Sequence, residues 1–158
     1  MAARMGRMIL ANDDGVNRWE HFRHGSDIGI RGIGSTKAQA FEQAALALIA
    51  AIVAPEAVRP KRKVAIHCDA ADDEFLLLDW INAVIFEMAT RNMLFCRFQV
   101  VLDDAAADAM VLDATAWGEP VDIARHCPAV EAKGATFTEL AVKPVHDGWW
   151  IAQCVVDV

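Results

Sequence analysis

The stretch of sequence that decides the fold is a short isoleucine-rich run with one carboxylate near its start: His24-Gly25-Ser26-Asp27-Ile28-Gly29-Ile30-Arg31-Gly32-Ile33. Isoleucine fits a pleated strand, and glycine allows a neighbouring backbone to approach closely. A carboxylate at the mouth of a buried strand has to be hydrated, hydrogen-bonded or bound to a cation. Two interpretations of Asp27 are therefore open at this point: a turn residue that precedes a strand, or a metal ligand.

Length and composition indicate a single domain with a large core. The chain has 158 residues, of which 55% are hydrophobic, and this is enough apolar surface to build one ordinary domain. No apolar run approaches the roughly 20 residues that span a bilayer, and the apolar run at residues 8–11 is too short for a signal peptide. We therefore expect a flexible leader over residues 1–17, one domain over residues 18–158, no membrane association and a cytoplasmic protein.

The net charge and the spacing of the cysteines limit which kinds of partner and of metal site are expected. The formal net charge is −7, which argues against strong independent binding to nucleic acid and favours a protein partner. The cysteines are widely spaced and form no Cys-x-x-Cys pair, so a structural zinc site is disfavoured and reduced thiols are expected. The four cysteines are Cys68, Cys96, Cys127 and Cys154.

The pattern of apolar residues predicts an α+β fold. Thr36 and Gln39 have the spacing of a helix capping box, and Asp147-Gly148 is a hairpin turn signal. Apolar residues at helical spacing predict helices over residues 36–52 and 72–92. Alternation predicts strands at 19–23, 27–34, 63–68, 94–102, 110–116, 130–137, 140–146 and 149–156, with a loop at 118–128. We therefore expect one domain in which two helices pack on a mainly antiparallel sheet.

Several sites that could carry catalysis fail on their chemistry. Residues 29–36 nearly match a phosphate-binding loop, but Ser35 stands where lysine is required, and the expected sheet is antiparallel. Ser26 and Ser35 are the only serines, and neither lies in Gly-x-Ser-x-Gly. Cys127 and His126 are neighbours in sequence, whereas a nucleophile and its base pair in space. We find no self-sufficient catalytic set and expect a protein that is not an enzyme.

A series of short motifs, in one order along the chain, resembles the archease family. The resemblance runs from about residue 19 to residue 158, and the shared order makes chance a poor explanation. The motifs are His24-Gly25-Ser26-Asp27-Ile28-Gly29-Ile30, Leu78-Asp79-Trp80-Ile81-Asn82, Ala116-Trp117-Gly118-Glu119-Pro120, Arg125-His126, Glu131-Ala132-Lys133-Gly134-Ala135-Thr136-Phe137 and Val155-Val156-Asp157-Val158.

The resemblance implies an accessory protein of tRNA splicing. Archeases assist the RNA-splicing ligase, which joins a 2′,3′-cyclic phosphate or 3′-phosphate end to a 5′-hydroxyl. They promote guanylylation of the ligase's active-site histidine by GTP and allow multiple turnovers. The resemblance implies that Asp27 and Asp157 bind a divalent cation, with a main-chain oxygen from Val158. The ligase is then the expected partner, and this protein is expected to contact GTP and RNA only when it is bound to the ligase.

The residue types agree with these implied roles. Two carboxylates without a nearby thiolate suit calcium, or magnesium or manganese, better than zinc. Lys133 is expected either to meet an acidic or phosphate group or to be a solvated strand lysine. His24 is expected either to orient a ligand of the metal or to be a satisfied turn histidine.

Two positions depart from the family pattern. The family usually has Thr-Ala where this chain has Gly25-Ser26, and an aromatic residue followed by histidine where this chain has Phe137-Thr138. If that histidine helps to bind metal or partner, the site is altered in this chain.

Two other functions stay open at the level of sequence. One is a chaperone-like modulator of RNA-modifying enzymes such as a tRNA methyltransferase, which a pull-down separates from a ligase accessory protein. The other is a metal-dependent hydrolase that uses Asp27. A hydrolase requires turnover by the isolated protein, and the sequence offers it neither a nucleophile nor a general base.

Overall fold

The structure, a computed structural model, describes residues 16–104 and 109–158. Residues 1–15 of the expected leader lie outside this range, and Asn17 accepts a hydrogen bond from the backbone of Ser35. The elements in chain order are β1 (Arg18–His24), β2 (Asp27–Gly34), α2 (Lys37–Ile52), η1 (Pro55–Ala57), β3 (Arg62–Ala70), α3 (Asp73–Arg91), β4 (Met93–Asp103), β5 (Met110–Pro120), α4 (Ile123–His126), β6 (Gly134–Ala135), β7 (Ala141–Pro144), η2 (His146–Gly148) and β8 (Trp150–Asp157).

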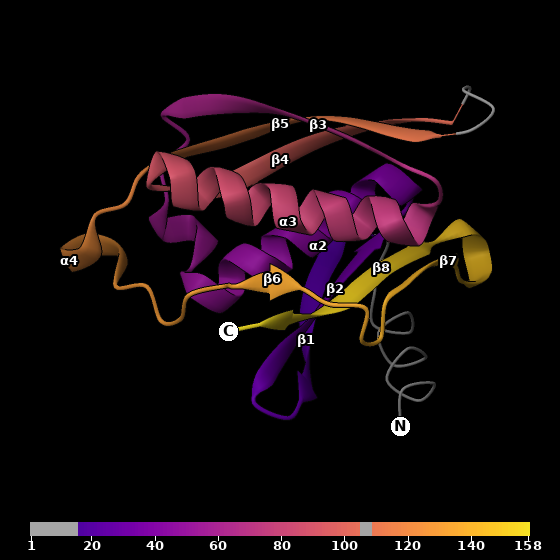
Figure 1. Ribbon diagram of the computed structural model, residues 1–158, viewed down its shortest axis with the longest axis horizontal. Coiled ribbons are helices and arrows are strands. Elements are labelled where there is room, and N and C mark those ends of the chain that lie inside the picture. The colour runs from indigo at the N-terminus through magenta and orange to yellow at the C-terminus, as the bar shows by residue number, and fades with distance from the viewer. Residues whose placement is uncertain (1–15, 105–108) are drawn as a thin grey trace.

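The strands form two antiparallel sheets, and the two long helices lie between them (Figure 1). The five-stranded sheet has the order β1-β2-β8-β6, with β7 also paired to β8, and the three-stranded sheet has the order β3-β5-β4. The expected α+β fold with antiparallel pairing is thus confirmed, and its sheet is divided into two. Within the described residues, no helix combines the length and apolar character needed to cross a bilayer.

The β1–β2 hairpin is closed by a two-residue turn at Gly25-Ser26. His24 pairs with Asp27 across the turn, and Gly25 has a φ of +60°. A glycine with positive φ at the first central position is the pattern of a type II′ turn, whose twist matches that of the flanking strands. The sequence therefore fixes where β2 begins, and with it the place of Asp27.

Strand β2 lies directly against α2 because two glycines remove the side chains that would separate them. A Cβ atom on Gly32 would lie 2.0 Å from the Ala40 carbonyl oxygen and 2.3 Å from the Ala44 nitrogen. A Cβ atom on Gly34 would lie 2.4 Å from the Ala40 nitrogen. The alanines at these helix positions are fully buried, so helix and strand approach at small residues on both sides.

This close approach gives the first prediction. We expect Gly32→Ala to lower the free energy of unfolding by at least about 1–3 kcal/mol, because the added methyl group meets backbone that cannot move without shifting α2. The measurement is urea unfolding of the variant against the unsubstituted protein. Gly134→Ala is the matched control, since its Cβ would meet only the Asn82 side chain, at 3.5 Å. Equal loss of stability in the two variants would contradict this account of the β2–α2 contact.

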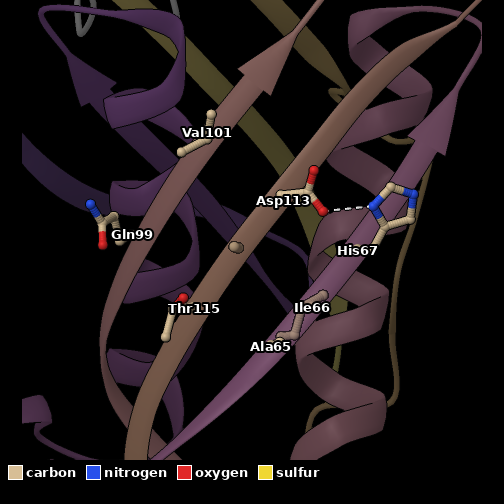
Figure 2. A pocket seen from close by; sticks show the side chains of 8 residues that line it. Ala65, Ile66, His67, Gln99, Val101, Asp113 and Thr115 are labelled. Carbon is tan, nitrogen blue, oxygen red and sulfur yellow. Dashed lines mark hydrogen bonds and ion pairs between the residues drawn. The ribbon is translucent and has the colours of Figure 1, made fainter.

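The three-stranded sheet buries one face against the helices, and among the described residues its other face is left exposed (Figure 2). On β3, Val64, Ile66 and Cys68 are buried and the residues between them are exposed, as the alternation predicts. On β4 the alternation breaks: the register against β5 shifts between Phe95 and Arg97. Because of this irregularity, Phe95 is fully buried although its neighbour Leu94 is buried too, whereas strict alternation would place the two on opposite faces.

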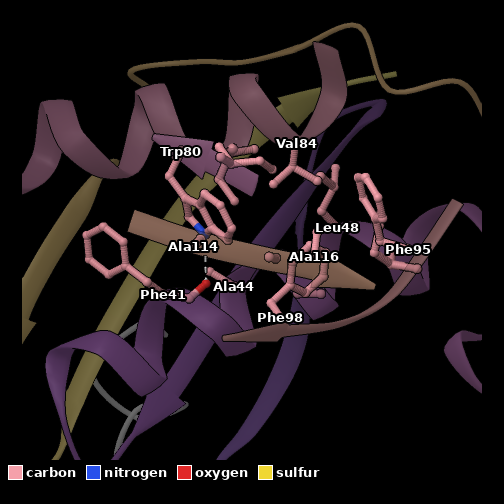
Figure 3. Close-up of a cluster of buried hydrophobic side chains, with 14 of the residues drawn as sticks. Phe41, Ala44, Leu48, Trp80, Val84, Phe95, Phe98, Ala114 and Ala116 are labelled. Atoms are coloured by element: carbon pink, nitrogen blue, oxygen red, sulfur yellow. Dashed lines mark hydrogen bonds between the residues drawn. The ribbon is translucent and has the colours of Figure 1, made fainter. Parts of the chain in front are cut away.

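The core between the sheets is built around the contact of α2 with α3 (Figure 3). Trp80 is fully buried, its indole N–H donates to the Phe41 carbonyl at 3.0 Å, and its ring packs edge-on against Phe98 at 5.7 Å. Both helices begin as expected: Thr36 caps α2 through the Gln39 backbone, and Asp72 caps α3 through the Phe75 backbone.

Two expectations for the second half of the chain are wrong. The predicted strand at 130–137 is reduced to Gly134–Ala135, because Ala129 bonds the α2 carbonyl of Ile52 and the Ala135 amide bonds the Asn82 side chain. The predicted loop at 118–128 starts later, because β5 continues to Pro120. The hairpin at Asp147-Gly148 is present, and β7, which carries Pro144, pairs with β8 and with no other strand of the described residues.

Candidate metal and partner site

The sheet register gathers the expected site residues at one end of the five-stranded sheet. His24 pairs with Asp27, Ile28 pairs with Val156, and Gly134 pairs with Asp157. Continuing the β2–β8 register by one residue puts Asp27 opposite Asp157. Directly opposed residues of an antiparallel pair point to the same face, with Cβ atoms about 4.5–5.5 Å apart. The last strand of the chain therefore lies beside the strand that starts at Asp27.

Backbone contacts hold the last residues in this place. The Val158 amide donates to Asp27 Oδ1 at 3.4 Å, and the Lys133 amide donates to the Asp157 carbonyl at 2.8 Å. The segment before β6 therefore covers one side of the chain end, and β2 covers the other. We call the set His24, Asp27, Lys133, Asp157 and Val158 the acid row.

The side chains of the acid row remain accessible to a partner. His24, Lys133 and Asp157 are exposed, whereas Asp27 is half-buried. The two carboxylates therefore lie at the rim of the sheet rather than inside the core. Such a site can present oxygen atoms outward to a cation or to the surface of another protein.

The oxygen atoms of the acid row suit a hard cation, but they are too few to complete its coordination. Carboxylate and main-chain oxygens from Asp27, Asp157 and Val158 are the ligand type of calcium and magnesium. Within residues 16–104 and 109–158, no group of three or more His, Cys, Asp or Glu side chains could hold a metal. Calcium takes about six to eight oxygens, so water or a partner would have to complete the coordination.

The buried cysteines offer neither a soft metal ligand nor a nucleophile. Burial raises the pKa of Cys68 to about 11 and that of Cys154 to about 12. Thiols with such pKa values stay protonated at neutral pH, and the thiolate is the form that binds metal or attacks. Cys127 donates its thiol hydrogen to the Ala124 carbonyl at 3.3 Å.

Thr138, where the chain departs from the family pattern, lies beside Val155 of β8. Val155 precedes Asp157 and Val158 of the acid row by two and three residues. The Thr138 carbonyl accepts a hydrogen bond from Val155 at 3.1 Å, and the Thr138 amide bonds the Thr136 hydroxyl at 3.3 Å. The preceding Phe137 is 65% exposed and packs edge-on against Phe75 on α3 at 5.8 Å. The backbone here is thus fixed, and Phe75 and Phe137 form an exposed aromatic pair beside it.

A second polar cluster, which the sequence analysis did not identify, lies at the C-terminal end of β5. Glu119 is only 2% exposed. Its Oε2 atom lies 2.6 Å from the Arg125 guanidinium, 3.0 Å from His126 Nε2 and 2.8 Å from the Arg59 backbone nitrogen. Arg125 also donates to the Ala57 carbonyl at 2.8 Å. We call Glu119, Arg125 and His126 the clasp, because they tie β5, α4 and the segment after η1 together.

The hydrogen bonds of the clasp define its protonation. The Asp122 amide donates to His126 Nδ1 at 2.9 Å, so in a neutral imidazole Nε2 carries the hydrogen and donates to Glu119. The Arg125 hydrogen bond, helped by the Arg59 amide and His126, lowers the pKa of Glu119 from 4.5 to about 2. The sequence held one signal for this cluster: Arg125 and His126 are adjacent and follow Gly118-Glu119-Pro120 by a few residues.

The structure thus defines a single-domain α+β protein with an oxygen-donor rim on its five-stranded sheet, and comparison with known proteins agrees. The sequence model described as "Archease protein family" matches residues 19–158. The chain is 33% identical over 143 residues to an archease from Pyrococcus furiosus, a match that covers 90% of this chain and all of the relative. It is 32% identical to an archease from Sulfurisphaera tokodaii, with the same coverage. The chain belongs to the archease family.

Solved structures agree with this assignment. The solution structure of Methanobacterium thermoautotrophicum protein 1598 is 25% identical, with a TM-score of 0.76, covering 89% of this chain and 98% of the other. A Thermotoga maritima protein, described as "an archease, possible chaperone", is 14% identical with a TM-score of 0.55, covering 88% and 99%. At that identity the second likeness concerns the fold alone.

Proposed function

We propose that this protein is an accessory factor of an RNA-splicing ligase, which binds a divalent cation at the acid row and promotes guanylylation and multiple turnover of the ligase. The observation that carries the proposal is the meeting of Asp27 with the end of β8 in a chain of the archease family. In this role the protein carries out no RNA chemistry itself.

Asp27, Asp157 and the main-chain oxygen of Val158 would hold the cation, with calcium the best fit. A divalent cation bound there supplies positive charge that can offset the negative charge of a nucleoside triphosphate during nucleotidyl transfer. The position at the rim supports this role, because a site that is completed from outside can present its cation to a partner. The turn at Gly25-Ser26 and the β2–β8 pairing keep the two carboxylates in place.

Lys133 and the aromatic pair extend the proposed surface. The Lys133 backbone is tied to Asp157, and its exposed ammonium group lies on the segment that runs alongside the chain end. A cation at this position would attract a phosphate or a carboxylate of the partner. Phe75 and Phe137, an exposed aromatic pair whose Phe137 directly precedes Thr138 in the chain, would add apolar contact area.

The test is guanylylation of a ligase from the same source, with labelled GTP. We expect catalytic amounts of this protein to increase the rate of labelled ligase formation and the number of ligation cycles per ligase, and we expect chelation of divalent cations to reduce the increase. Ligase that is labelled equally fast without this protein would contradict the proposal. Retention of a methyltransferase instead of a ligase in a pull-down would favour the chaperone-like alternative.

A further inference from the structure

The open face of the three-stranded sheet is divided into a basic end and an acidic end. The register aligns exposed or half-buried residues of the three strands in four rows. The rows, written in the order β3, β5, β4, are Lys63-Trp117-Arg97, Ala65-Thr115-Gln99, His67-Asp113-Val101 and Asp69-Val111-Asp103.

The spacing of the charges is the same on both outer strands. Lys63 and Asp69 are six residues apart on β3, and Arg97 and Asp103 are six residues apart on β4. Six residues of strand span about 20 Å, so opposite charges stand at the two ends of the face. The Arg97 guanidinium also lies 4.2 Å from the centroid of the Trp117 ring.

The middle of the face is hollow because its second row is made of small side chains on two strands. A hollow of about 420 Å³ is lined by residues of the second and third rows, and the side chains around it do not fill it (Figure 2). Ala65 and Thr115 are the small members, while the third row carries His67 and Asp113, joined at 2.7 Å, and Val101, which is 60% exposed.

From these observations we infer that the open face of the three-stranded sheet is an interface between two copies of this protein. A two-fold axis that lies in the interface and runs across the strands places each strand over its own counterpart in the opposite direction. The first row then lies over the fourth row of the second copy, so Lys63 meets Asp69 and Arg97 meets Asp103. An interface of this kind is isologous and closes at two subunits.

The same operation matches shape as well as charge. The third row of one copy lies over the second row of the other, which puts His67 over Ala65, Asp113 over Thr115 and Val101 over Gln99. On β3 and β5 the larger side chain of one copy therefore lies over the smaller side chain of the other. An axis parallel to the strands would instead place the first row over itself and bring like charges together, so charge selects one of the two arrangements.

The size of the face sets the expected strength. Three strands about 4.8 Å apart and about 20 Å long give a footprint on the order of 300 Å², below the roughly 800 Å² per partner of a standard stable interface. We therefore expect reversible dimerisation in the micromolar range. Because the paired charges are near solvent, added salt should weaken it.

The experiment uses two charge-reversed variants of the whole chain in sedimentation equilibrium. We expect the unsubstituted protein to dimerise across the micromolar range and to dissociate as salt is added. K63E/R97E makes the face acidic and D69K/D103K makes it basic, so each variant alone should be monomeric. An equimolar mixture should form a heterodimer, because the basic face now meets the acidic one.

The mixture also shows whether the variants are folded, since a heterodimer forms only from two intact faces, and melting curves of each variant provide an independent check. R23E/K143E is the matched control: it changes the net charge as K63E/R97E does, at exposed positions of the other sheet, and should dimerise like the unsubstituted protein. An unsubstituted protein that stays monomeric at low salt, or variants that remain monomeric when mixed, would overturn the inference.

Discussion

Stimulation of ligase guanylylation should be lost in Asp27→Ala, and the fold should be retained. Asp27 stands at the rim of β2, half-buried, with the Val158 amide at 3.4 Å from its Oδ1 atom. That distance is long for a hydrogen bond, so its loss costs little. Its carboxylate supplies at least one of the few oxygens that the protein itself offers to a cation, and removal leaves too few donors for binding.

Stability in the absence of metal should not fall and should rise slightly. Asp27 lies opposite Asp157 when the β2–β8 register is continued by one residue, and like charges that face each other across a sheet destabilise it, by roughly 0.2–1 kcal/mol. Alanine removes that repulsion. A divalent cation has the opposite effect in the unsubstituted protein, since a ligand at 100 times its Kd adds about 2.7 kcal/mol to the free energy of unfolding.

Thermal melts with and without calcium, together with the guanylylation assay, test both consequences. The unsubstituted protein should melt at a higher temperature when calcium is added, and Asp27→Ala should not respond. Asp104→Ala removes the same charge from an exposed position at the end of the other sheet and should behave as the unsubstituted protein does. A calcium response that persists in Asp27→Ala would show that the cation binds elsewhere.

The first half of the fold could be predicted because its signals are local. The run from Asp27 to Gly34 predicts β2 with its observed bounds, and Thr36 and Asp72 predict the starts of the two long helices. Each of these predictions depends on residues a few positions apart in the sequence. Such residues are in contact whenever the helix or turn forms, whatever the rest of the chain does. The acid row followed from the family resemblance, and the confirmed β2–β8 pairing supports its geometry.

The parts that were missed depend on distant contacts. The burial of Phe95 follows from a register shift against β5, and the alternation within β4 carries no trace of it. The predicted strand near β6 is short because α2 and Asn82 bind its backbone. Arg31, only 6% exposed, is another example: it donates to Gln153 at 2.7 Å and pairs with Glu20, partners from two neighbouring strands.

The clasp joins Glu119 to Arg59, sixty residues away in the chain, and we expect Glu119→Gln to destabilise the folded state. One oxygen of Glu119 receives hydrogen bonds from Arg125, His126 and the Arg59 backbone. A glutamine keeps the shape and can place its amide oxygen where Oε2 accepts these bonds, but it carries no charge. The buried His126 and the Arg125 guanidinium, whose side chain is 32% exposed, would then donate to a neutral acceptor, and hydrogen bonds to a neutral group are weaker than those to a carboxylate.

The pH dependence distinguishes the charge of Glu119 from its packing. The pKa of Glu119 is lowered from 4.5 to about 2 when the protein folds, chiefly by the Arg125 hydrogen bond. A carboxylate with a lowered pKa stabilises the folded state fully above pH 4.5, and this stabilisation is lost as the pH falls toward 2. The difference in stability between the unsubstituted protein and Glu119→Gln should therefore be largest near neutral pH and should shrink below pH 4.5.

Urea unfolding of both proteins between about pH 7 and pH 3 measures this difference, in a range where the carboxylate of the unfolded chain takes up its proton. Glu56→Gln, at an exposed position of η1, is the control for loss of one carboxylate and should follow the unsubstituted protein throughout. A difference between the unsubstituted protein and Glu119→Gln that is constant over the whole range would mean that the clasp acts through packing alone. A difference that shrinks as expected would assign the stability of the α4 segment to the charge of one buried carboxylate.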